Sequence, residues 1–147
     1  MGASTDVIIG DPDAQHVLIR PISRRHPGLF DHTDANWIEC ECRIAAGPFR
    51  GEIRADLRSE ELSTFLDELR ALANTREGLA GLTPMEGQFA MTLAGDGRER
   101  IQASGEGVSE ANRLQFRFEL DAAVLPSVCE SLARVLSAFP VVAAPEI

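Results

Sequence analysis

The sequence predicts an α+β fold, in which an antiparallel β-sheet of about seven strands carries two α-helices. Three observations support this. Apolar and polar residues alternate along several segments, as in strands with one buried and one wet face. Tight turns join neighbouring strands into hairpins and meanders, and two longer segments repeat apolar residues at helical spacing. We expect the order ββββ-α-βββ-α, with both helices packed on the sheet.

The chain begins with two short predicted strands, at residues 6–10 and 16–22, with a turn at Asp11-Pro12-Asp13 between them. The next segment, 23–35, is polar and contains Pro27-Gly28. We expect it to be an irregular loop of the kind that is either functional or mobile.

Residues 36–72 form the unit around which we expect the rest of the fold to be organised. In the first strand, Ile38, Cys40, Cys42 and Ile44 fall on one face and Trp37, Glu39, Glu41 and Arg43 on the other. After Gly47-Pro48 the alternation repeats from Phe49 to Leu57. One register places Arg43 opposite Glu52 and Glu41 opposite Arg54, whereas the next pairs like charges. Each such pair is worth only about 0.2–1 kcal/mol, but this favours the first register and a loop from Ala46 to Phe49.

A helix follows the hairpin directly. Ser59 is expected to be its N-cap, because serine is a preferred cap and two acids follow in the first turn. The helix then presents an apolar stripe formed by Leu62, Phe65, Leu66, Leu69 and Leu72.

The second half of the chain repeats this plan of a meander followed by a helix. An edge strand is expected near 79–82, with longer strands at 88–94, 99–107 and 113–120. Gly105 and Gly107 indicate a bulge, a bend or close packing. The last helix follows Asp121, with Pro126 in its first turn and Pro140 at its end, and 141–147 is a short apolar tail.

Length and composition indicate one domain over residues 1–147 in a cytoplasmic protein. The chain has a net charge of −9 and contains no Lys and no Tyr. It has no apolar run long enough to span a bilayer and no secretory signal. The acidity disfavours nucleic acid and anionic membranes as partners and suits a basic protein, although a diffuse acidic surface serves solubility first.

No cluster of residues predicts catalysis, a metal or a cofactor. The loop residues His26, Asp31, His32 and Asp34 are ligand types, but their spacing matches no known metal motif, so we interpret them as solvated. Three cysteines do not make a disulfide framework. We expect Cys40, Cys42 and Cys129 to be buried, reduced thiols.

The wet face of the hairpin is where we expect a partner to bind. It carries Trp37, Glu39, Glu41, Glu52 and Asp56. The acids fit a solvated face first, a binding surface second and an active site third. Trp37 either tucks under the long loop or serves as an aromatic anchor, since Trp is enriched at binding hot spots.

Several of these segments resemble the WapI-type immunity protein family. The resemblance runs from about Val17 to Pro140. The matching stretches are Asp34-Ala35-Asn36-Trp37-Ile38, Gly47-Pro48-Phe49, Ser59-Glu60-Glu61-Leu62, the block 112–121 and Leu125-Pro126.

The resemblance implies a non-enzymatic protein that binds and neutralises a partner toxin, for which a basic nuclease would be suitable. It transfers no site residues. The alternative is a structural domain that self-associates through its wet sheet face or a sheet edge. A third reading is a small-molecule binder or hydrolase that uses the long loop.

Overall fold

A computed structural model of the chain describes residues 5–24 and 36–142. It confirms the antiparallel α+β fold and divides eight strands between two four-stranded sheets. Sheet A consists of β1 (Val7–Gly10), β2 (His16–Arg24), β3 (Trp37–Ala46) and β4 (Phe49–Arg58). Sheet B consists of β5 (Glu77–Leu82), β6 (Phe89–Asp96), β7 (Arg100–Ser109) and β8 (Asn112–Asp121). The helices are α2 (Ser59–Thr75), the 3-10 turn η1 (Ala122–Val124) and α3 (Leu125–Ala138).

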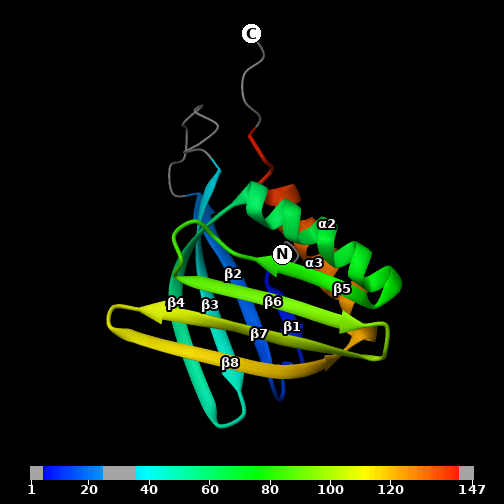
Figure 1. The fold of residues 1–147 in the computed structure, drawn as a ribbon. Coiled ribbons are helices and arrows are strands. Elements are labelled where there is room, and N and C mark those ends of the chain that lie inside the picture. The colour runs from blue at the N-terminus through cyan, green and yellow to red at the C-terminus, as the bar shows by residue number, and fades with distance from the viewer. Residues whose placement is uncertain (1–4, 25–35, 143–147) are drawn as a thin grey trace.

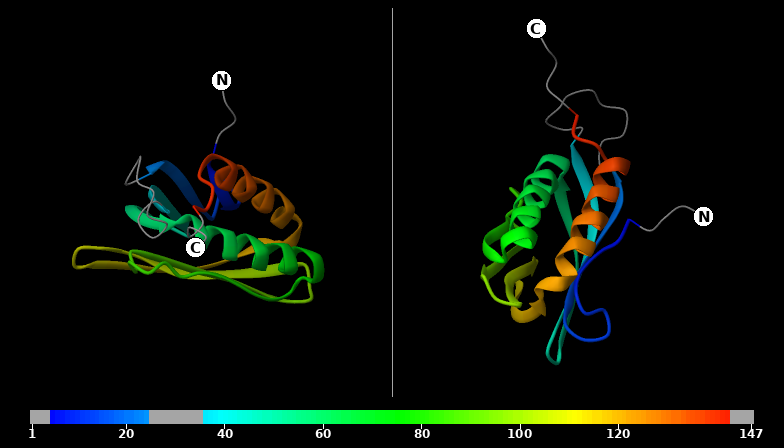
Figure 2. Two further views of the ribbon diagram at one scale, coloured as in Figure 1. Left: turned by 90° about the horizontal axis from the view of Figure 1, so that it is seen from above. Right: turned by 90° about the vertical axis from the view of Figure 1, so that its right-hand side faces the viewer.

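The two sheets cross at a steep angle, with the helices packed between them at one end (Figure 1). Within each sheet the strands follow chain order, so every neighbouring pair is a hairpin or meander connection. Seen from above, α2 lies along sheet B and α3 lies nearer sheet A (Figure 2). The helices also contact each other and so close the open end of the sheets.

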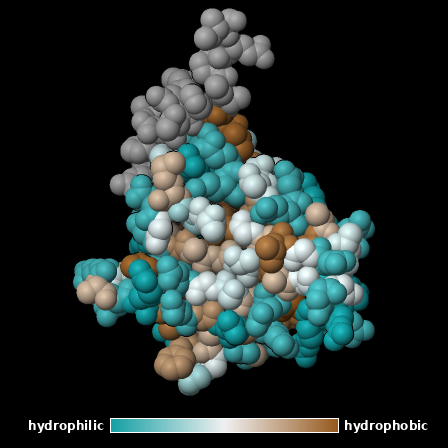
Figure 3. Space-filling view, in the orientation of Figure 1, coloured by the Kyte–Doolittle hydropathy of each residue, from teal (hydrophilic) through white to brown (hydrophobic). Residues whose placement is uncertain are grey.

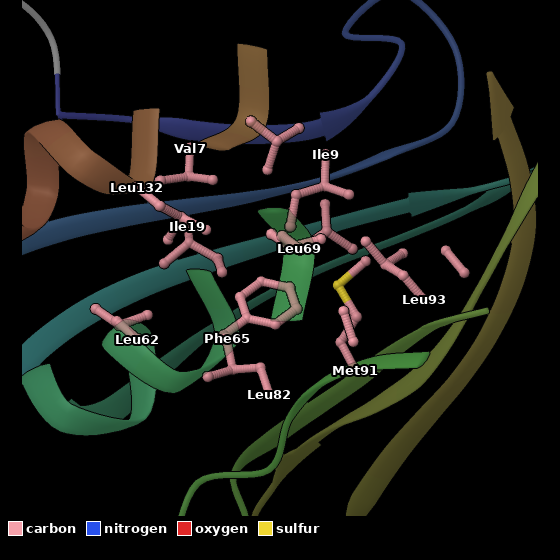
Figure 4. Packing of buried hydrophobic residues seen from close by; sticks show 14 of the residues in the cluster. Val7, Ile9, Ile19, Leu62, Phe65, Leu69, Leu82, Met91, Leu93 and Leu132 are labelled. Atoms are coloured by element: carbon pink, nitrogen blue, oxygen red, sulfur yellow. The ribbon is translucent and has the colours of Figure 1, made fainter. Parts of the chain in front are cut away.

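The core lies where the inner faces of the sheets meet the helical stripes (Figure 4). Phe65 and Leu69 of α2 are fully buried among Ile19 of sheet A and Met91 and Leu93 of sheet B. The predicted stripe of α2 is confirmed, since each of its members is buried. Burying one such side chain contributes about 1.5–3 kcal/mol, so each of them helps to hold the two sheets and the helices together.

The predicted register of the β3–β4 hairpin is confirmed. Arg43 lies opposite Glu52 and Glu41 opposite Arg54. Ala46 pairs with Phe49, which leaves Gly47-Pro48 as the tip. Gly47 has a φ of 58°, a left-handed conformation that glycine adopts without steric cost.

The predicted N-cap at Ser59 is wrong by one residue. Arg58 is the N-cap, and Ser59 is the buried first residue of α2. The reason is that the β3–β4 ladder continues to this point: the Ser59 N–H donates to the Asn36 carbonyl oxygen at 2.9 Å. The side chain of Glu61 caps the start of α2, because its Oε1 accepts the Arg58 N–H at 2.8 Å.

Asn36 fastens the C-terminal segment to the start of β3. Its side chain is fully buried. Its Oδ1 accepts the Val142 N–H at 2.7 Å, and its Nδ2 donates to the Val142 carbonyl at 3.2 Å. Arg24 donates to the Pro140 carbonyl beside it. The apolar tail therefore docks as far as Val142, while 143–147 lie outside the described residues.

Two glycines allow close packing, Gly105 within sheet B and Gly107 against sheet A. A Cβ on Gly105 would lie 2.1 Å from the Ala90 carbonyl oxygen, and one on Gly107 would lie 2.9 Å from Ile44 of sheet A. The β6–β7 and β7–β8 registers run without interruption, so close packing is the correct one of the expected alternatives, and a bulge is not. Strand β2 extends to Arg24, two residues past its predicted end, and the rest of the expected loop, 25–35, lies outside the described residues.

Candidate partner-binding face

The five residues predicted to bind a partner lie together on one face of sheet A. Trp37, Glu39 and Glu41 alternate along β3, and Glu52 and Asp56 stand on β4. We call this side, which faces away from the core, the outer face. Its charged and aromatic side chains are Asp6, Arg20, Trp37, Glu39, Glu41, Arg43, Arg50, Glu52, Arg54, Asp56 and Arg58.

The outer face carries five carboxylates and five guanidinium groups, so it has no net charge. The protein's charge of −9 is therefore not concentrated here. Sheet B presents a different surface, which faces the viewer in Figure 3 and has pale and brown residues at its centre, with hydrophilic residues around them. Leu79 of β5 is 68% exposed. Small residues of β5–β7 point outward there, namely Gly81, Ala90, Thr92, Ala94 and Ser104. The outer face of sheet A is thus the better candidate for binding a charged partner.

Glu41 stands at the centre of a charge network. Its Oε1 lies 2.8 Å from Arg43 Nη2 and 4.0 Å from Arg20 Nη1. Arg20 also binds Asp6 at two points, at 2.8 and 2.9 Å. This hydrogen bonding and the charge of Asp6 raise the pKa of Arg20. Glu41 is thereby held in place and is 14% exposed, whereas Glu52, 3.5 Å from Arg43, is 60% exposed.

Glu39 and Asp56 form the most acidic point of the face. They lie directly opposite each other across β3 and β4, an arrangement that costs energy because the charges are alike. Arg54 Nη1 contacts Glu39 Oε1 at 3.0 Å. Gln88 closes the other side, where its Oε1 accepts the Asp56 N–H at 2.8 Å. These four residues line a hollow of about 300 Å³, which we call the acidic hollow.

Gln88 was not predicted as part of the site. It is 32 positions from Asp56 along the chain, and sequence reasoning placed it only at the start of a strand. No local pattern could reveal it, because it reaches the face through the crossing of the two sheets.

Trp37 is half-buried at the end of the face. The guanidinium of Arg58, its cross-strand partner, lies 5.6 Å from the centre of the indole ring. Glu60 and Glu61 hold Arg58 at 3.2 and 3.5 Å. The ring is therefore stacked under a fixed cation, at a distance typical of cation–π pairs.

The cysteines are buried and unpaired, as expected for core thiols. Burial raises the pKa of Cys42 to about 12 and also raises the pKa of Cys40 and of Cys129. Such thiols are poor nucleophiles, because the thiolate is the reactive form. The expected loop ligands His26, Asp31, His32 and Asp34 lie outside the described residues.

The described part of the chain holds no helix long and apolar enough to cross a membrane. Within residues 5–24 and 36–142, no group of three or more His, Cys, Asp or Glu side chains is placed to hold a metal ion.

The fold and this face define a small α+β protein with an exposed sheet surface suited to polar contacts. Residues 7–140 match the model of the Immunity protein WapI-like family, and the chain belongs to this family. Among solved structures, the crystal structures of Trypanosoma bruciei MRP1/MRP2 match with a TM-score of 0.48 and 12% identity, covering 90% of this chain and 83% of that chain. No curated protein gives a significant match.

Proposed function

We propose that the protein binds and neutralises a cognate toxin and performs no chemistry of its own. The observation that carries this proposal is the family match over residues 7–140. The outer face supports it by offering charged groups that are already fixed by ion pairs, so that little side-chain entropy is lost on binding.

We infer that the toxin is basic and inserts a Lys or Arg side chain into the acidic hollow. The opposed carboxylates of Glu39 and Asp56 repel each other in the free protein. Arg54 offsets part of this repulsion through its contact with Glu39 at 3.0 Å, and a further cation would balance the one carboxylate in excess among the four residues of the hollow. The amide oxygen of Gln88 accepts the Asp56 N–H and has a second lone pair, so this oxygen is the part of Gln88 that can accept a hydrogen bond from an incoming cation.

Long-range charge and local charge would have separate roles. The net charge of −9 would speed the encounter with a basic partner, in a manner weakened by salt. The neutral, alternating pattern of the outer face would select the partner, because a wrong alignment brings like charges together. A basic nuclease fits both requirements. Trp37, stacked on Arg58, would form an aromatic border to the contact.

The test is co-expression with the product of the neighbouring gene, followed by co-purification and a measurement of rescue from toxicity. We expect a stable complex and rescued growth. If no neighbouring product binds the protein or harms cells in its absence, the toxin-neutralising function is wrong.

The role of the outer face is tested separately, by measuring the affinity of variants of this protein for the same toxin. Glu39→Gln with Asp56→Asn should raise the Kd about tenfold or more, since it removes both carboxylates of the hollow. The matched control is Glu130→Gln with Asp67→Asn, which removes two exposed carboxylates from the helices. Equal affinities for the two double variants would place the contact elsewhere while leaving the function intact.

A further inference from the structure

Strand β4 leaves part of its backbone open at the edge of sheet A. The ladder bond from the Ser59 N–H to Asn36 shows that odd-numbered residues of β4 bond to β3. Even-numbered residues therefore direct their N–H and C=O groups outward. At the end nearest α2, two outward N–H groups are occupied, those of Arg58 by Glu61 and of Asp56 by Gln88.

The remaining outward N–H groups of β4 are open. Those of Arg50, Glu52 and Arg54 have no acceptor among the residues that the structure describes. The inward side chains of this stretch, Gly51, Ile53 and Ala55, carry no charge, and the β3–β4 register contains no bulge. The protection that remains between Arg50 and Arg54 is the charge on each outward side chain, so only a strand that carries the complementary charges can pair with this edge.

The other edge strands are better protected. Strand β1 has four residues and lies against α3. At the edge of β5, the Gly81 N–H donates to Glu68 of α2 at 3.0 Å. The β1–β2 turn and the end of β8 together line a hollow of about 440 Å³, so that turn lies beside the second half of the β8 edge. Strand β4 offers the clearest stretch for adding another strand.

We propose that this edge pairs with the same edge of a second copy of the chain, antiparallel and about a two-fold axis at Ile53. The outward residues alternate in charge as Arg50, Glu52, Arg54 and Asp56. With the axis at Ile53, Glu52 faces Arg54 in the new ladder. The side chains of Arg50 and Asp56 also lie opposite each other, at the point where Gln88 already occupies the Asp56 N–H, and every pair of side chains is opposite in charge. A second copy always carries this matching pattern, whereas an unrelated strand would have to reproduce it.

The neighbouring registers are less favourable. With the axis at Glu52, this residue faces itself and Arg50 faces Arg54, so all pairs are alike in charge. With the axis at Gly51, Arg50 faces Glu52, but Arg54 faces Pro48, which lacks an N–H. The same charge rule correctly selects the β3–β4 register within one chain. The resulting dimer would contain one continuous eight-stranded sheet.

The first experiment is sedimentation of the full chain, without any partner, from micromolar to millimolar concentrations. We expect a concentration-dependent monomer–dimer equilibrium. Glu52→Pro should abolish the dimer and leave the monomer folded by circular dichroism, because this N–H makes no bond to β3 and proline is tolerated at strand edges. A monomer throughout the range, or a dimer that tolerates Glu52→Pro, would overturn the proposal.

A charge exchange tests the register. Glu52→Arg and Arg54→Glu each create two like-charge pairs about the Ile53 axis, so each variant alone should dimerise about tenfold more weakly. Mixing the two variants should restore the dimer, because the arginine introduced into one variant then faces the glutamate introduced into the other. Arg117→Glu on the edge of β8 is the matched control and should dimerise like the wild type. Undiminished dimerisation of Arg54→Glu alone would exclude the Ile53 axis.

Discussion

The buried thiols of sheet A should make the protein unusually sensitive to alkaline pH. Cys40 and Cys42 are fully buried. Desolvation, together with the charge of Glu41, raises the pKa of Cys42 to about 12 from an ordinary value of 9.0, and desolvation likewise raises the pKa of Cys40. The chain has no Lys and no Tyr, so few other side chains titrate between these values. The thiols should therefore dominate the pH dependence of stability in this window.

The sign follows from which state binds more protons. Above pH 9 the thiols of the unfolded chain ionise, whereas those of the native protein remain protonated. The native state then holds more protons, so stability is fully present below pH 9 and falls as the pH rises towards 12. Each thiol costs about 1.4 kcal/mol per pH unit. At pH 11 the loss is about 5 kcal/mol for the pair, comparable with the total stability of a small domain.

The assay is urea unfolding at pH 7, 9, 10 and 11, followed by circular dichroism. We expect the free energy of unfolding of the wild type to fall steeply above pH 9. Cys40→Ala with Cys42→Ala will be less stable at pH 7, because cavities form, but its pH slope should be much shallower. Cys129→Ala is the control and should retain the slope due to the β3 thiols. Equal slopes in the wild type and the double variant would refute the reasoning.

Two further predictions concern the packing of Gly105 and the hydrogen bonds by which Asn36 fastens the C-terminal segment. Gly105→Ala should destabilise the protein by about 2 kcal/mol or more, because the new Cβ overlaps a carbonyl of β6, whereas Gly81→Ala, with its nearest neighbour 4.0 Å away, should have little effect in the same thermal melt. Asn36→Ala should cost about 1–3 kcal/mol through its lost bonds to Val142. Deleting 141–147 removes the same bonds, so the combined variant should lose less stability than the sum of the two separate losses in a double-mutant cycle. Simple additivity would contradict the role of Asn36 in fastening this segment.

The elements of this fold could be predicted from the sequence because each carries a local signal. Alternation along β3 and β4 shows which side chains are buried, and the charge pattern then selects the register. The α2 stripe likewise needs no tertiary information. Local patterns do not reveal which inner faces meet each other. For this reason the division into two sheets, which depends on contacts such as Gly107 against Ile44, was not predicted.

The wrong N-cap and the contacts that were not predicted have the same physical origin, because each depends on residues that are distant along the chain. Ser59 looks like an N-cap in isolation, but its N–H is taken by Asn36, 23 positions away, so its side chain is buried. Gln88 enters the acidic hollow, and Val142 reaches Asn36, through contacts between distant parts of the chain. A single sequence shows that the outer face is polar, but it does not show which groups from elsewhere complete it.

Asp56 connects the two proposals. In the acidic hollow it would attract a basic side chain of the toxin, and in the proposed dimer it faces Arg50 of the second copy. One carboxylate at the strand edge cannot serve both cations equally well, so toxin binding and self-pairing should oppose each other. Because such coupling is reciprocal, toxin should dissociate the dimer to the same degree that dimerisation weakens toxin binding. At high protein concentration, Glu52→Pro should then bind toxin more tightly than Glu52→Gln, which removes the same carboxylate of the outer face but keeps the N–H at the strand edge.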